Sequence, residues 1–122
     1  MLINGTWTQS AATRGFAVIN PATGAVIEEV ADGGRDEADA AIDAAHEALP
    51  AWRATTAYER SAILYKAYHL MLERREELAQ LMTTEQGKPL RAARTEVQYG
   101  ADFLLWFAEE AKRIYGETIP AP

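Results

Sequence analysis

The sequence contains no cysteine and only two histidines among its 122 residues. The missing cysteine excludes disulfides, thiolate metal ligands and a cysteine nucleophile within this chain. No spacing joins His46 to His69, and neither belongs to a histidine-and-carboxylate pattern typical of a metal site. Each could act as a general base, but a solvated position on a helix is the simpler interpretation. The residues alone therefore predict no catalytic site.

Further absences narrow the function. The sequence contains no glycine pattern typical of a phosphate loop or a dinucleotide-binding turn. The pair Gly33-Gly34 fits a simple turn between a strand and a helix. The net charge of −6, with no basic cluster, argues against nucleic acid or an anionic membrane surface as a partner. The first residues lack the basic and then apolar pattern of a signal peptide, so we expect a cytoplasmic location. We also expect this chain alone to bind no cofactor.

Short extended segments at the start give way to helices. Asn4-Gly5, flanked by apolar residues, is a strong signal for a two-residue hairpin turn. A second hairpin is predicted around the turn at residues 20–24. Apolar spacing then predicts helices over residues 35–49, 56–86 and 90–115, the second bent or broken by the charged run at 73–77. We expect an α+β chain, a single domain or domain fragment, with a β-hairpin region at 1–32 and a helical region of three or four helices at 35–116.

Recognisable residues mark the helix boundaries. Pro50 predicts the end of the first helix, and Thr56 with Glu59 forms a capping box that opens the second. Gly87 and Gly116 are placed as C-terminal caps. The predicted inward stripes are Ala38, Ala41, Ile42, Ala45 and Leu49; then Ile63, Leu64, Ala67, Leu70 and Met71; then Ala93, Val97, Ala101, Leu104, Ala108, Ala111 and Tyr115.

Residues 97–108 are apolar on every side of the predicted helix except at Gln98 and Asp102. A surface helix has one apolar stripe, whereas a helix that is apolar all round needs cover on all sides. The segment is too short to span a bilayer, which takes about 20 apolar residues. Its aromatic residues are more typical of a protein core than of a ligand tunnel. We therefore expect this segment to lie inside a body larger than the chain, and the isolated chain to self-associate.

Five motifs in a fixed order carry a family resemblance. They are Ile3-Asn4-Gly5-x-Trp7, Asn20-Pro21-Ala22-Thr23-Gly24, Glu85-Gln86-Gly87-Lys88-Pro89, Trp106-Phe107-Ala108-Glu109-Glu110-Ala111-Lys112-Arg113 and Tyr115-Gly116-Glu117-Thr118-Ile119-Pro120. Together they closely resemble the aldehyde dehydrogenase superfamily along almost the whole chain. Residues 84–122 are most similar to the succinate-semialdehyde dehydrogenase branch. The resemblance implies the N-terminal part of the family's α/β fold, from a longer parent chain.

The resemblance implies a function for that parent. Family members oxidise aldehydes to acids with NAD or NADP, using a cysteine nucleophile, a glutamate base and an asparagine that helps to hold the oxyanion. In the family these groups, and most of the nucleotide pocket, belong to segments after the last residue of this chain. The chain would then be the N-terminal segment of an NAD(P)-dependent aldehyde dehydrogenase, with succinic semialdehyde as a candidate substrate, and inactive alone. Its implied partners are the rest of a dehydrogenase chain or a second copy, in a homo-oligomer.

Two sites also follow from the resemblance. Some family structures hold a monovalent cation, and the matching groups here are the Glu85 carboxylate with the backbone carbonyls of Val18 and Ile19. The helix matching 90–115 lines one wall of the aldehyde entry channel. The matching positions in this sequence are Glu96, Tyr99, Gly100 and Phe103. From spacing alone, Glu85 and Lys88 are a helix-end pair, and a core or capping role is the simpler interpretation of all these residues.

A second hypothesis is a stand-alone helical interaction or oligomerisation module without catalysis. Such a module should present an apolar patch with a polar rim. Residues 97–108 are instead apolar on opposed sides, which fits an interior element better. The sequence does not distinguish between NAD and NADP, or between aldehydes, and it does not define the oligomeric state.

Overall fold

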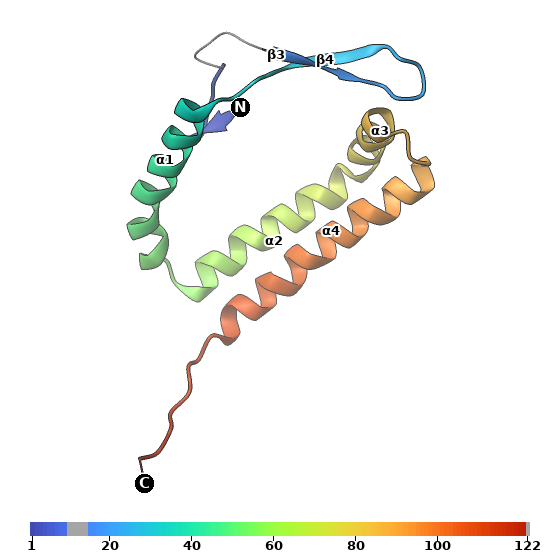
Figure 1. Cartoon of the computed structure of the whole chain (residues 1–122). Coiled ribbons are helices and arrows are strands. Elements are labelled where there is room, and N and C mark those ends of the chain that lie inside the picture. Colours follow the sequence, from blue (N-terminus) through green and yellow to red (C-terminus); the bar gives the residue numbers. More distant parts are fainter. Residues whose placement is uncertain (10–14, 122) are drawn as a thin grey trace. The chain divides into compact units, whose positions relative to one another are not determined.

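The computed structural model describes residues 1–9 and 15–121, in which short strands are followed by helices (Figure 1). The strands are β1 (Leu2–Ile3), β2 (Thr6–Trp7), β3 (Gly15–Ile19) and β4 (Val26–Ala31). The helices are α1 (Arg35–Ala54), α2 (Ala57–Glu73), α3 (Arg75–Gln86) and α4 (Leu90–Glu110), followed by the 3₁₀ turn η1 (Ala111–Arg113). This order confirms the predicted α+β class.

The described chain forms two compact units. One contains Met1–Ala54 and Leu81–Lys88, and the other contains Thr55–Gln80 and Pro89–Pro122. The first unit therefore holds both hairpins and α1, and the second holds α2, α4 and η1.

Both predicted hairpins are present in the first unit. Strands β1 and β2 pair antiparallel around Asn4 and Gly5, whose φ angles of 49° and 73° suit a two-residue turn. Strands β3 and β4 also pair antiparallel, with an irregular register between Val18 and Ile19. In the turn that joins them, the Ala22 N–H donates to Asn20 Oδ1 at 2.9 Å. The local turn chemistry therefore sets both hairpins, as predicted.

Helix α1 differs from its prediction in two respects. It continues through Pro50 to Ala54, because a proline removes one intrahelical hydrogen bond and kinks a helix without necessarily ending it. The stripe predicted to face inward is not buried, and Ile42 is 65% exposed. The physical reason is that α1 contacts β1, a strand of two residues that cannot cover a 20-residue helix.

Helices α2 and α4 lie side by side and antiparallel, and their contact forms the core of the second unit (Figure 1). The buried side chains along this contact are small. They are Ser61 on α2 and Ala93, Val97, Ala101 and Ala108 on α4. Small residues allow two helix axes to approach closely, since the interaxial distance depends on the side chains at the contact. Four positions of the stripe predicted for the last helix are thus confirmed.

The remaining predicted stripe positions are less well buried. Ile63 and Leu70 of α2 are exposed, because the packed face of α2 is rotated toward Ser61 and toward Tyr65, which reaches α4. The last helix ends at Glu110, so Tyr115 lies outside it and is 84% exposed.

Predicted helix boundaries elsewhere are confirmed. The Thr56 N–H donates to Glu59 Oε2 at 2.6 Å and the Glu59 N–H donates to Thr56 Oγ1 at 3.2 Å, which completes the capping box. The charged run breaks the second helix at Arg74. Gly87, with φ +72°, closes α3 through a 2.9 Å hydrogen bond from its N–H to the Thr83 carbonyl.

An ion pair joins α3 to α4 within the second unit. Arg94 donates to both carboxylate oxygens of Glu76, at 2.8 and 2.6 Å. These hydrogen bonds favour the charged carboxylate and lower the pKa of Glu76. The stabilisation from this pair is therefore present above the ordinary pKa of a glutamate, and it is lost as the pH falls through the lowered value.

Candidate functional site

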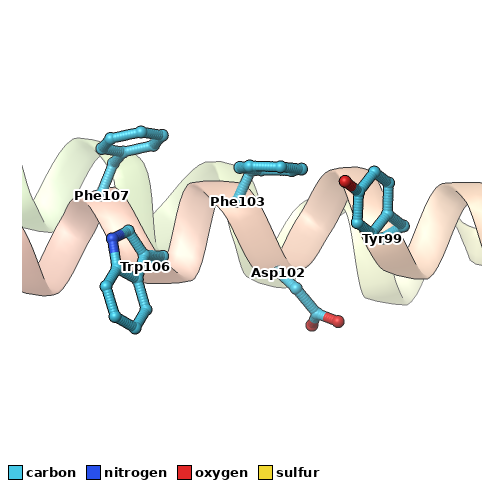
Figure 2. Close-up of a pocket in the computed structure, with 5 residues that line it drawn as sticks. All are labelled: Tyr99, Asp102, Phe103, Trp106 and Phe107. Carbon is cyan, nitrogen blue, oxygen red and sulfur yellow. The ribbon is translucent and has the colours of Figure 1, made fainter.

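Helix α4 presents an open hollow of about 290 Å³ on the side where it is not packed against α2. Figure 2 shows the side chains that line it projecting from α4, with the ribbon of α2 behind. Their spacing of three and four residues places them on one side of the helix. We call this surface the aromatic face, and it consists of Tyr99, Asp102, Phe103, Trp106 and Phe107.

The rings of Tyr99, Phe103 and Phe107 in the aromatic face pack against one another along α4. Tyr99 and Phe103 meet edge to face with centroids 4.9 Å apart, and Phe103 and Phe107 are stacked at 6.4 Å. Tyr99 and Trp106 remain 63% and 62% exposed. Because Ala101 is fully buried on the other side of α4, the helix is apolar on opposed sides, as the sequence predicts. Within the described chain these rings are not core, since too little of that chain covers them, and their burial inside a larger body stays a prediction.

The structure brings two of the four predicted channel residues into this face. Tyr99 and Phe103 line the hollow, and Glu96 lies exposed on α4 one turn before Tyr99. Gly100 lies against α2 instead, because a Cβ added there would be 3.5 Å from Cε of Met71. The resemblance did not select Trp106 and Phe107 for the channel. Their helical spacing from Phe103 does group them with a possible ligand tunnel, although core was the preferred interpretation of these rings.

Among the described residues, Asp102 is the single charged one that lines the hollow. Its Oδ1 accepts a 2.9 Å hydrogen bond from Nε2 of Gln98, one turn earlier on the same helix. The face therefore combines apolar rings with one carboxylate that already has a partner. This arrangement suits apolar contact and exclusion of water, and it contains no nucleophile paired with a base.

The residues of the predicted cation site lie in the same compact unit. Glu85 is exposed near the end of α3, and Val18 and Ile19 stand where the register of β3 and β4 is irregular. A Cβ added at Gly87 would lie 2.9 Å from Cγ of Pro21, so the turn after Glu85 lies directly against the turn after Ile19. The turns that follow the two halves of the predicted site are thus in contact, and the site itself stays a prediction.

The two histidines take no part in either place. His46 is exposed on α1. His69 is exposed on α2, where its ring contacts those of Tyr65 and Tyr68, with centroids 6.4 and 5.0 Å away. Within residues 1–9 and 15–121, no three histidine or acidic side chains gather as metal ligands would. No helix in the same part of the chain has both the length and the apolar character to cross a membrane.

Comparison with known proteins gives a consistent result along the chain. The sequence model described as "Aldehyde dehydrogenase family" matches residues 7–122. Glutarate-semialdehyde dehydrogenase from Pseudomonas putida is 57% identical over 118 residues, which are 97% of this chain and 25% of that protein. Succinate-semialdehyde dehydrogenase [NADP(+)] from Escherichia coli is 55% identical over 119 residues, 98% of this chain and 25% of that protein.

A solved structure gives the same picture. The crystal structure of an E. coli NADP-dependent enzyme is similar with a TM-score of 0.97 and 54% identity, over 98% of this chain and 25% of that one. The chain therefore spans about a quarter of the length of the relatives that it matches. The resemblance inferred from the five motifs is confirmed, and the alternative of a stand-alone interaction module is not favoured.

We predict that the isolated chain self-associates through the aromatic face, because its exposed rings gain free energy when they leave water. Trp106→Glu should lower the mass measured by light scattering toward that of a monomer. Trp7→Glu is the matched control, since Trp7 is 80% exposed in the first hairpin and should leave the mass unchanged. A clean monomer of the unaltered chain at high concentration would contradict the prediction.

Proposed function

Because the chain belongs to the aldehyde dehydrogenase family, we propose that it serves as the N-terminal segment of an NAD(P)-dependent enzyme that oxidises an aldehyde to an acid. The proposal rests on how much of this chain, and how much of each relative, the matches cover. Relatives above 50% identity match nearly all of this chain, while the chain spans only a quarter of each. A chain with this much sequence identity to the matching segment of its relatives is suited to the same position in a similar enzyme.

The names of the two relatives support a proposal for the substrate class. Both are named for semialdehydes, molecules that carry an aldehyde at one end and a carboxylate at the other. We therefore propose a short semialdehyde as the substrate, with succinic semialdehyde as the first candidate.

The chain alone is proposed to be inactive. It contains no cysteine to act as a thiolate nucleophile. The hollow on α4 also does not suit a dinucleotide, whose phosphates need N–H donors such as a helix N-terminus provides. Its lining is apolar apart from Asp102, a carboxylate that would repel phosphate. We place the nucleophile and the NAD(P) pocket in the part of the enzyme outside these residues.

The contribution of α4 is proposed to be one wall of the channel through which the aldehyde enters. Tyr99 and Phe103 would present their rings to the substrate and exclude water, and Glu96 would extend the wall one turn earlier on the same helix. The support is that the two rings already form part of an open apolar hollow in this chain. Gly100, which packs toward Met71, would act by keeping α4 close to α2.

A monovalent cation site is proposed at Glu85 with the backbone carbonyls of Val18 and Ile19. Carboxylate and carbonyl oxygens are the ligands that hard cations prefer. The irregular register at Val18 and Ile19 supports the proposal. Such an irregularity interrupts the regular hydrogen bonds between two strands, and backbone carbonyls at an interruption are suited to bind a cation.

The proposed function is tested by reconstitution with the E. coli relative. The chain is co-expressed with that enzyme lacking its own matching N-terminal segment, and reduction of NADP is followed with succinic semialdehyde. We expect steady turnover from the pair and none from either piece alone. The positive control is the relative's own N-terminal segment supplied with the same remaining part.

Two results would contradict the proposal. Turnover by this chain alone would show that it carries a catalytic centre. Absence of turnover from the pair, when the positive control is active, would show that the chain cannot serve as the N-terminal segment of such an enzyme.

The channel wall is tested in the reconstituted enzyme by Phe103→Ala. Loss of the ring should raise KM for the semialdehyde about tenfold with a smaller change in kcat, which corresponds to about 1.4 kcal/mol of lost binding. Phe16→Ala makes the same chemical change on β3 and should leave KM as it was. An unchanged KM in Phe103→Ala would remove α4 from the channel.

The cation site is tested by Glu85→Gln. In the unaltered chain we expect Tm to rise when K⁺ or Na⁺ replaces a bulky organic cation at constant ionic strength, because a ligand of the folded state stabilises it. Glu85→Gln should abolish that rise. The control Glu47→Gln removes an exposed carboxylate from α1 and should preserve it. A rise that persists in Glu85→Gln would contradict the site.

A further inference from the structure

Helix α4 ends earlier than its own residues predict. Ala111, Lys112 and Arg113 are good helix formers, and the glycine suited to end the helix comes only at Gly116. Yet the α-helix ends at Glu110 and continues as the 3₁₀ turn η1. Local propensity does not account for this ending. A tertiary contact is available instead, because α2 contacts η1.

Tyr65 of α2 is the side chain that meets this end of α4. Its hydroxyl donates a 3.1 Å hydrogen bond to Oε1 of Glu109, and Nζ of Lys112 lies 5.5 Å from the centre of its ring. All three residues are half-buried, and partial removal from water strengthens both kinds of contact. The hydrogen bond to Glu109 favours the neutral phenol and raises the pKa of Tyr65.

Glu109 lies in the last turn of α4, and Lys112 lies three positions later in η1. Residues three positions apart are neighbours on one side of a helix, so a single tyrosine of α2 reaches both. The carboxylate then meets the hydroxyl of Tyr65 while the ammonium lies over its ring.

We propose that Tyr65 locks the end of α4: by holding Glu109 and Lys112 it ends the helix at Glu110 and sets the direction in which the chain leaves η1. Directly after η1 the chain turns again, since the Tyr115 N–H donates to the Arg113 carbonyl at 3.0 Å. Residues 114–121 form neither helix nor strand. The lock is a property of this chain alone, and it does not depend on the proposed dehydrogenase activity.

Amide hydrogen exchange of the 122-residue chain, measured residue by residue by NMR, tests the lock. Tyr65→Phe removes the hydroxyl and keeps the ring, and Lys112→Gln removes the cation and keeps the hydrogen bond to Glu109. In each variant we expect exchange of the amides at 109–115 to become about two- to tenfold faster, the effect of losing one such contact. The amides at 93–101, in the α2–α4 contact, should be unchanged.

Tyr68→Phe is the matched control. It removes a hydroxyl from the same helix, and its ring packs on His69, so exchange at 109–115 should be unaltered. Unchanged exchange at 109–115 in Tyr65→Phe would overturn the proposal. An equal increase in Tyr68→Phe, or an increase spread evenly over α2 and α4, would overturn it as well.

Discussion

The close antiparallel contact between α2 and α4 is the constraint on which the rest of the second unit depends. Ala93, Ala101 and Ala108 are fully buried there because small side chains let the helices approach. Large apolar residues of α4 cannot share that narrow contact, so they project from the opposite side as the aromatic face. The same packing places Tyr65 beside the end of α4. The buried contact and the exposed rings are thus two consequences of one arrangement.

The features that sequence alone predicted are those determined by neighbouring residues. The Asn4-Gly5 turn, the capping box of Thr56 with Glu59 and the Gly87 cap each need only a few consecutive positions, and each is present. The predicted ends of α1 and α4 were wrong because neighbouring residues do not determine them. Helix α1 continues through Pro50. Helix α4 ends where Tyr65, a residue of another helix that is far away in the sequence, holds Glu109.

The candidate site was predictable to a similar extent. The resemblance identified Tyr99 and Phe103, which do line the hollow, and helical spacing pointed to the neighbouring rings. Sequence could not reveal that Gly100 packs toward Met71, since that depends on how α2 meets α4. It also could not supply the other walls of a channel or the nucleotide pocket. Those parts are proposed to come from segments that the chain does not contain, since it spans a quarter of its relatives.

We propose that protein outside these 122 residues covers the aromatic face of α4. Fluorescence of Trp106 tests this proposal most directly, in a variant where Trp7→Phe and Trp52→Phe leave Trp106 as the only tryptophan of the chain. In the dilute chain we expect solvent-like emission that iodide quenches. In complex with the remaining part of the E. coli relative, we expect emission shifted to the blue and protected from iodide. Emission and quenching unchanged by the complex would contradict the claim.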